Sequence, residues 1–263
     1  MAGATRIILS GATGRMGRTV AGLAAGDPSF AVVGGIDRDS ADRSPGDPLE
    51  LVSPTGAASL LEGSDAVIDF SAPEFLTQLL EANGDALRGV ALVVGTTGLG
   101  DDEERLLNGV AERSPVLTAA NFSVGVNLLL SLVESAARAL GPEYDIEIVE
   151  THHRRKEDAP SGTALALGES IARGRGQSLG PVRRDGRTGR PGARPEGEIG
   201  FHSLRGGDII GDHQVHFIGE VERLELTHRA SDRALFAAGA LRAVRWLAGR
   251  EPGRYSMRDV LGL

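Results

Sequence analysis

The sequence predicts an α/β protein: a Rossmann-like, doubly wound parallel sheet with a second α+β domain that contains a mixed or antiparallel sheet. Three observations lead to this prediction. Short apolar runs alternate with amphipathic stretches over the first 120 residues, as in βαβ units. A glycine-rich turn, 11–17, follows the first apolar run. Three strand-like segments after residue 198 lack intervening helices, which is typical of an antiparallel or mixed sheet.

The elements of the first domain follow from apolar runs and helical spacing. Ser71 is a candidate cap and Pro73 lies near the first turn of the second predicted helix. The third predicted helix has an acidic first turn. We expect strands at 6–10, 31–36, 66–70, 90–94 and 116–119, and helices at 15–25, 73–87 and 101–113.

The pattern changes near Asn121, where the second domain begins. A helix over 124–140 ends at the stop signal Gly141-Pro142, and the final helix, 231–247, returns to the first domain. We therefore assign 1–122 plus 234–263 to a dinucleotide-binding domain and 123–233 to a second domain. Within the latter we expect strands at 144–151, 199–204, 208–218 and 223–228, loops at 152–160 and 175–197, and a helix at 161–173.

Composition excludes several classes of function. The formal net charge is −8 and only 4% of residues are aromatic, which argues against a nucleic-acid binder. The chain contains no Cys, so disulfides, thiolate metal sites and a Cys nucleophile are excluded. The opening apolar run is too short for a signal or membrane segment, and the helix at 124–140 carries polar residues. We expect a cytoplasmic protein without a membrane partner.

The glycine-rich turn is a candidate dinucleotide fingerprint. Gly11, Gly14 and Gly17 lie between a predicted strand and a predicted helix, where glycines allow close approach of a pyrophosphate to the helix N-terminus. Thr13 replaces the usual middle glycine. Asp37 ends the second strand 37 − 17 = 20 residues further on, where an acid binds ribose hydroxyls, and Arg38 could instead hold a 2′-phosphate. The alternative is a glycine-rich turn that binds nothing.

Two further loops follow predicted parallel strands. Gly95-Thr96-Thr97-Gly98 follows one strand, and Ala119-Ala120-Asn121-Phe122 follows the next. Ligands of open α/β sheets bind at the carboxyl edge of the strands, where both loops would lie. Either loop alone would be unremarkable, but together with the fingerprint they indicate a nucleotide site.

The segment from His152 to Lys156 is a candidate anion site. Its five cationic or titratable side chains precede a helix that begins with Ser161, Gly162 and Thr163. Backbone N–H groups and hydroxyls at a helix start can hold a carboxylate, and Lys156 and a histidine supply charge. Histidine is also a natural proton donor near neutral pH. The alternative is a solvated basic loop.

A metal site is not expected. His213 and His216 would face opposite sides of a strand, and no pair of histidines has helical ligand spacing. We interpret His202, His213, His216 and His228 as ordinary strand residues.

Taken together, these motifs resemble the 4-hydroxy-tetrahydrodipicolinate reductase (dihydrodipicolinate reductase) family, and ETHHRRK followed by DAPSGTA is the most specific part. The similarity covers nearly the whole chain. The matching segments are GATGRMG (11–17), GTTG (95–98), AANFSVGVN (119–127), EIVETHHRRKEDAPSGTA (147–164), GFHSLRGGDIIGDH (200–213) and ELTHRASDR (225–233).

The resemblance implies a reaction, cofactors and partners. The reaction is NADH- or NADPH-dependent reduction of 4-hydroxy-tetrahydrodipicolinate to tetrahydrodipicolinate with loss of water, in lysine and diaminopimelate biosynthesis. The substrate is a small cyclic dicarboxylate. The second domain would bind this substrate and assemble the chain into a homotetramer.

The resemblance also implies roles for individual residues. The catalytic pair would be His152 and Lys156, and the substrate contacts would be His153, Ser161, Gly162 and Thr163. The cofactor contacts would be Gly11, Ala12, Thr13, Gly14, Arg15, Met16, Asp37, Arg38, Gly95, Thr96, Thr97, Ala119, Ala120, Asn121 and Phe122.

The departures from the family pattern are small. Asp37 stands where family members often carry Glu, and the 176–197 loop matches only in part, at 184–189.

Two other functions compete with the one that the resemblance implies. A semialdehyde dehydrogenase would need the Cys that the chain lacks. A regulatory nucleotide-binding module would explain the first domain but not the segment from His152 to Thr163.

Overall fold

The computed structural model describes residues 3–38 and 50–263. The chain divides into two compact units, Met1–Ser123 with Ala234–Gly262 and Val124–Arg233. Each unit has its own sheet and its own apolar core. The predicted fold class, a parallel α/β sheet with a second mixed-sheet domain, is confirmed.

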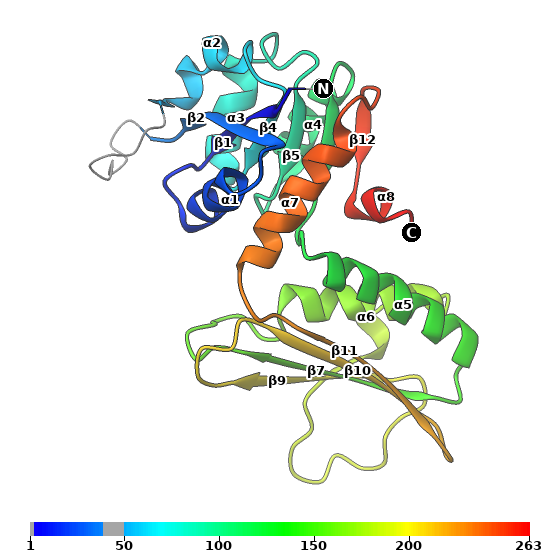
Figure 1. Cartoon of the computed structure of the whole chain (residues 1–263). Coiled ribbons are helices and arrows are strands. Elements are labelled where there is room, and N and C mark those ends of the chain that lie inside the picture. Colours follow the sequence, from blue (N-terminus) through cyan, green and yellow to red (C-terminus); the bar gives the residue numbers. More distant parts are fainter. Residues whose placement is uncertain (1–2, 39–49) are drawn as a thin grey trace. The chain divides into compact units, whose positions relative to one another are not determined.

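The first unit contains a seven-stranded sheet in which every strand pairing is parallel. The strand order is β12-β6-β5-β4-β1-β2-β3, so successive strands leave β1 first in one direction and then in the other (Figure 1). The boundary between β1 and β4 is therefore the switch point where such sheets bind ligands. The strands are β1 (Thr5–Ser10), β2 (Phe30–Ile36), β3 (Leu51–Val52), β4 (Ala66–Asp69), β5 (Ala91–Val94), β6 (Pro115–Thr118) and β12 (Gly253–Tyr255).

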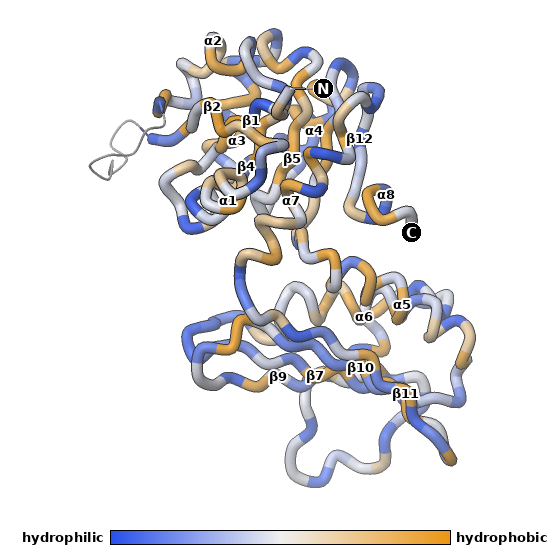
Figure 2. The backbone as a smooth tube through the Cα atoms, viewed as in Figure 1, coloured by the Kyte–Doolittle hydropathy of each residue, from blue (hydrophilic) through white to orange (hydrophobic). Residues whose placement is uncertain are grey.

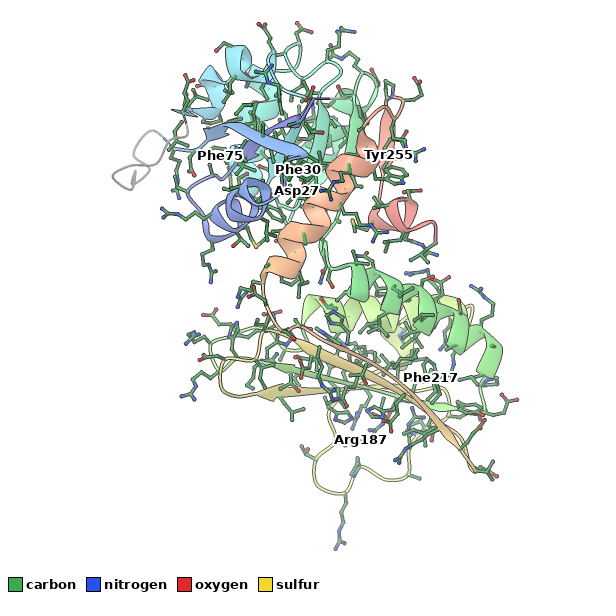
Figure 3. The ribbon with its side chains drawn as sticks, in the orientation of Figure 1. Asp27, Phe30, Phe75, Arg187, Phe217 and Tyr255 are labelled. Carbon is green, nitrogen blue, oxygen red and sulfur yellow. The ribbon has the colours of Figure 1, made fainter. Side chains whose placement is uncertain are left out.

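Helices pack against this sheet through apolar faces. The core includes Ile8 and Leu92 from the strands and Leu76 from a helix, all without solvent exposure. Side chains also join distant parts of the chain. Arg245 donates to Asp27 and lies 4.6 Å from the centre of the Phe30 ring. Asp27 and Phe30 are labelled in Figure 3. The helices are α1 (Arg15–Ala25), the short turn η1 (Pro54–Gly56), α2 (Ala58–Leu61), α3 (Pro73–Ala82), α4 (Asp101–Ala111), α7 (Ala234–Leu247) and α8 (Met257–Leu261).

The second unit contains a mixed five-stranded sheet in the order β11-β10-β7-β9-β8. β7, β9 and β8 run parallel, and β10 runs antiparallel to β7 and β11. The elements are α5 (Val124–Leu140), β7 (Asp145–His152), α6 (Gly162–Gly174), η2 (Gly180–Val182), β8 (Arg183–Asp185), β9 (Ile199–Arg205), β10 (Asp212–Ile218) and β11 (Arg223–Arg229).

The two helices of the second unit cover one face of its sheet (Figure 1). In Figure 2 apolar segments of α5 and α6 alternate with polar ones, as expected for helices with one buried face. Ile146 and Ile148 of β7 and Phe217 of β10 are buried beneath them. The opposite face carries Arg187, which lies away from the helices (Figure 3).

Most predicted elements are present, but several limits were wrong. α3 ends at Ala82 instead of residue 87, because the Asn83 side chain donates to the carbonyls of Leu79 and Pro54 and closes the helix. The expected loop at 175–197 contains η2 and β8. The strand expected at 208–218 begins only at Asp212.

Five further short elements were not predicted: β3, η1, α2, β12 and α8. None is longer than five residues, which is too short for a hydrophobic period to be seen. In addition, none of the helices in the described ranges 3–38 and 50–263 is long and apolar enough to span a membrane.

Replacing either of two glycines of α1 by alanine should change the free energy of unfolding in opposite directions. A Cβ on Gly17 would lie 2.4 Å from the Gly11 carbonyl oxygen, whereas a Cβ on Gly22 would have no neighbour within 4 Å. We expect Gly17→Ala to lower the free energy of unfolding by about 1–3 kcal/mol through overpacking. Gly22→Ala should raise it by up to about 1 kcal/mol through helix propensity. Urea unfolding followed by circular dichroism measures both, and equal effects would contradict the contact at Gly17.

Candidate active site

The glycine-rich loop between β1 and α1 packs closely against the backbone that follows β4. Gly11 has φ +74°, and a Cβ there would lie 2.7 Å from the Phe70 carbonyl oxygen, so only glycine fits. Gly14 is the N-cap of α1, which leaves the N–H groups of Arg15, Met16 and Gly17 without partners inside the helix. Ala12 is buried beneath the loop.

Asp37 is held against this loop. Its Oδ2 accepts hydrogen bonds from the Thr13 amide at 2.8 Å and from the Thr13 hydroxyl at 2.7 Å. Its Oδ1 accepts from the Arg38 amide at 2.9 Å. Thr13 therefore replaces the middle glycine of the fingerprint with a side chain that binds the acid.

A cavity of about 420 Å³ opens beside this loop. It lies at the carboxyl ends of β1, β2 and β4, next to the switch point of the sheet. Five of the predicted fingerprint residues thus line one space, whereas Ala12, Arg15, Met16 and Gly17 are not part of its lining. Its lining consists of Gly11, Thr13, Gly14, Asp37, Arg38, Phe70, Ser71, Ala72, Glu74, Phe75 and Gln78.

Asp69, at the end of β4, is a buried acid that sequence reasoning missed. It accepts hydrogen bonds from the Ser10 and Thr96 hydroxyls, both at 2.5 Å, and from the Ser71 hydroxyl at 2.6 Å. Burial raises its pKa, and these three hydroxyls act in the opposite direction. The carboxyl group joins the ends of β1, β4 and β5. An Asp that ends an otherwise apolar strand was the signal that could have identified it.

The two other predicted loops lie at the same edge of the sheet. Gly95 follows β5, and a Cβ there would meet the Phe70 ring at 2.1 Å. Thr96 is buried and Thr97 is exposed. After β6, Phe122 is buried with its ring centre 5.7 Å from that of Phe70.

The rest of the loop after β6 is more accessible. Ala119 and Asn121 are half-buried and Ala120 is exposed. The Asn121 carboxamide accepts a hydrogen bond from the Ser123 amide at 2.8 Å, which forms a turn before α5. The loops after β1, β5 and β6 therefore share one edge, as the parallel arrangement predicts.

A second polar cluster lies in the other unit, at the end of β7. Alternation along the strand places Glu150 and His152 on the face that carries Ile146 and Ile148. Glu150 is 1% exposed and accepts from the two terminal nitrogens of the Arg205 guanidinium, at 2.7 and 2.8 Å. Burial alone would raise the pKa of Glu150, but hydrogen bonds from Arg205, Ser203 and His152 lower it to about 2.

His152 is the predicted catalytic histidine and lies within this cluster. Its Nδ1 is 2.6 Å from Glu150 Oε2, and the side chain is almost fully buried. Burial lowers the pKa of His152, whereas the Glu150 carboxylate raises it and the charges of Lys156 and Arg205 lower it again.

The start of α6 contacts the same cluster. The Ser161 amide donates to Glu150 at 3.2 Å, and the Ser161 hydroxyl accepts from the Ala164 amide as the helix cap. Gly162 is exposed and Thr163 is half-buried in the first helical turn. Glu150 therefore links the segment that begins at His152 to the Ser-Gly-Thr helix start.

His213 was interpreted as an ordinary strand residue, and that interpretation is incomplete. It lies on β10 with 3% exposure, its Nε2 is 3.1 Å from the Ser161 hydroxyl, and its ring centre is 5.2 Å from that of His152. Burial lowers the pKa of His213 to about 4, so it is neutral near pH 7. No sequence pattern distinguishes it from the other strand histidines.

Only part of the segment from His152 to Lys156 lies in this cluster. Lys156 is half-buried and binds the Asp158 carboxylate at 2.7 and 2.9 Å. His153 is also half-buried, and its Nδ1 is a buried atom without a hydrogen-bond partner. Arg154 and Arg155 are exposed, and Arg155 pairs with Asp208, so these two arginines do not join the cluster.

Two of the remaining strand histidines, His202 and His216, lie outside this cluster. His202 contacts Glu147 at 2.8 Å, and His216 lies 3.5 Å from Glu225. Among the residues that the structure describes, no group of three or more His, Asp or Glu side chains is arranged to hold a metal ion.

Comparisons with known proteins match both units of the chain to one family. Residues 5–122 match the description "Dihydrodipicolinate reductase, N-terminus" and residues 125–261 match "Dihydrodipicolinate reductase, C-terminus". The 4-hydroxy-tetrahydrodipicolinate reductase of Alkalilimnicola ehrlichii is 48% identical, covering 98% of this chain and 99% of that protein. The enzyme of the same name from Acinetobacter baumannii is 46% identical, covering 100% and 98%.

Solved structures share the fold. The dipicolinate-bound dihydrodipicolinate reductase of Paenisporosarcina sp. TG-14 superposes with a TM-score of 0.74 at 22% identity, covering 96% of this chain and 97% of that one. The meso-diaminopimelate dehydrogenase mutant of Clostridium tetani gives a TM-score of 0.55 at 11% identity, covering 97% and 94%.

The switch-point cavity, the glycine-rich loop and the acid after β2 define a dinucleotide-dependent oxidoreductase. The matches over both units identify which one. The chain belongs to the dihydrodipicolinate reductase family, the 4-hydroxy-tetrahydrodipicolinate reductases of lysine biosynthesis, which use a nicotinamide cofactor.

Proposed function

We propose that the first unit binds the nicotinamide cofactor and that the second unit binds and protonates the cyclic dicarboxylate substrate. The observation that carries this proposal is the cluster of His152, Glu150 and Ser161 at the start of α6. The Paenisporosarcina relative, which binds dipicolinate, supports a dicarboxylate as the ligand.

The residues of the first unit fit a dinucleotide. The glycine-rich loop lines the cavity at the end of β1, and the first turn of α1 offers N–H groups for a pyrophosphate. Asp37 retains acceptor capacity for ribose hydroxyls beyond its bonds to Thr13 and Arg38. A reduced nicotinamide held there supplies the hydride. The further contacts that we propose are those assigned by family resemblance at 11–16, 95–97 and 119–122.

The second unit provides anion recognition and a proton. Lys156 and the start of α6 offer charge and N–H donors for carboxylates, with Ser161, Gly162, Thr163 and His153 as proposed contacts. The substrate first loses water, its hydroxyl leaving together with a hydrogen of the neighbouring ring carbon. The ring then gains a hydride, and the electron-rich ring takes one proton. His152 donates this proton from its imidazolium form, which accounts for every atom of tetrahydrodipicolinate.

The catalytic assignment predicts large losses of turnover. His152→Gln should lower kcat by about 10²–10⁴-fold, because it removes the general acid. Lys156→Ala should also lower kcat strongly, because it removes a fixed charge near the reacting ring. Cofactor absorbance measures turnover, and fluorescence titration measures NADH affinity, which should barely change. Near-normal turnover in both variants would refute the assignment.

Cofactor preference depends on two adjacent residues of opposite charge. The Asp37 carboxylate favours NADH by binding ribose hydroxyls, and Arg38 favours NADPH by pairing with its 2′-phosphate. We expect both cofactors to work within about tenfold, which corresponds to roughly 1.4 kcal/mol. Arg38→Ala should lower kcat/KM for NADPH more than kcat/KM for NADH, and Asp37→Ala should lower kcat/KM for NADH more than that for NADPH. An unchanged ratio in Arg38→Ala would place Arg38 away from the ribose.

We also propose a homotetramer assembled through the sheet face of the second unit that α5 and α6 leave open. Leu204 and Ile218 lie on this face, opposite Thr151 and Asp145 in the register of β7, and are 49% and 39% exposed. Apolar side chains exposed on one sheet face suit burial against another copy.

Sedimentation should give about four times the chain mass for the wild type, and a smaller species for Leu204→Glu or Ile218→Glu. Val221→Glu is the control, because Val221 is 97% exposed in the turn after β10. A monomeric wild type would refute the proposal.

A further inference from the structure

We propose that Glu150 is a positioning residue for the protonation step: it orients the His152 ring so that Nε2, and not Nδ1, delivers the proton. This proposal rests on the proposed role of His152 as the acid. It assigns a function to a side chain that the sequence motifs left without one.

The geometry leaves one ring nitrogen for chemistry. Glu150 Oε2 lies 2.6 Å from His152 Nδ1, so this nitrogen carries the proton that it donates to the carboxylate. In the neutral ring Nε2 is then unprotonated, and in the imidazolium it holds the second, transferable proton. The tautomer is therefore determined by Glu150.

Gly211 keeps the other side of the ring open. A Cβ at this position would lie 2.9 Å from His152 Nε2 and 3.6 Å from Cε1 of His213. Any other residue would bring a carbon atom against the nitrogen that must reach substrate. The absence of a side chain at Gly211 and the carboxylate at Glu150 thus assign opposite roles to the two ring nitrogens.

The carboxylate is itself firmly held. Both of its oxygens accept from Arg205, and Oε1 also accepts from the Ser161 amide. Arg205 in turn donates to the Asp158 carbonyl, which connects β9 to the loop after β7. Because Glu150 cannot rotate without losing these bonds, the ring that it binds is fixed as well.

The charges around the ring show why a carboxylate is needed there. Lys156 and Arg205 both disfavour an imidazolium at position 152, while Asp158 pairs with Lys156. His213 packs edge-on against the ring and stays neutral, and His228 of β11 also acts on His213. Glu150 is the group that favours the cationic ring, and it stays ionised throughout because its pKa is about 2.

The proton step then balances simply. The imidazolium Nε2–H bond breaks, the proton joins the reduced ring of the substrate, and its electron pair remains on Nε2. His152 becomes neutral with its Nδ1–H still bound to Glu150. Solvent restores the Nε2 proton before the next turnover.

Glu150→Gln tests this role. Loss of the negative charge should lower the pKa of His152, so the ring is protonated only at lower pH. Since the acid must be protonated, the alkaline limb of the kcat profile should move to lower pH, and kcat at pH 7.5 should fall by about 10²–10³-fold. NADH affinity should stay within about twofold. A residue with a merely structural role would not move the alkaline limb.

The matched control is Glu147→Gln. Glu147 lies on the same strand but on the opposite face, and it also binds arginines, Arg187 and Arg194, and a histidine, His202. Its replacement removes an equivalent network at a distance from His152. The alkaline limb should stay in place.

Nitrogen NMR of ¹⁵N-histidine-labelled enzyme reads the tautomer directly, with His152 assigned by comparison with His152→Gln. The neutral wild-type ring should be protonated at Nδ1. This measurement uses the wild-type enzyme, so it does not depend on whether a Glu150 variant folds. An Nε2-protonated ring would overturn the proposal. So would an unmoved alkaline limb in Glu150→Gln while His152→Gln is impaired. Normal turnover in His152→Gln would instead refute the proposed function of His152, and with it this deeper inference.

Discussion

A carboxylate buried in a protein must find hydrogen-bond donors, and this constraint organises both units. In the second unit Glu150 is satisfied by Arg205 from β9, by the Ser161 amide from the start of α6 and by His152 from its own strand. Removing one partner of such a group typically costs several kcal/mol. The donors that Glu150 requires are therefore the groups that define the site.

The first unit meets the same constraint with neutral donors. Asp69 is surrounded by three hydroxyl groups from the ends of β1, β4 and β5 and has no cation bonded to it in the contacts of the described residues. Desolvation therefore dominates, and its pKa is raised, whereas that of Glu150 is lowered. The pKa values of the two acids shift in opposite directions because Glu150 is paired with a guanidinium and Asp69 is not.

Close contacts at three glycines set the shape of the loops at the strand ends of the first unit. Gly11, Gly17 and Gly95 each lie where a Cβ would come within 3 Å of another atom. Thr13 departs from the fingerprint without cost, because its side chain points to Asp37 and forms a hydrogen bond there. The requirement for glycine is thus steric at all three positions, and at Gly11 it is also conformational because φ is +74°.

Local sequence was sufficient for much of this protein. The helices at 15–25 and 124–140 have the limits that their spacing predicted, and the parallel strands could be identified as short apolar runs. The positions of Gly11, Asp37 and the loops after β5 and β6 followed from topology, since carboxyl ends of parallel strands share one edge. The basic segment and the Ser-Gly-Thr helix start were recognisable from residue types alone.

What remained undecided depended on contacts between residues far apart in the chain. The end of α3 is set by Asn83 reaching Pro54, which no periodicity reveals. His213 and Arg205 are 61 and 53 residues from His152, and their roles exist only because β7 pairs with β10 and β9. The sequence by itself determined which chemical groups are available. Only the tertiary structure decided which of them are buried together, because desolvation and hydrogen bonding act between neighbours in space and not in sequence.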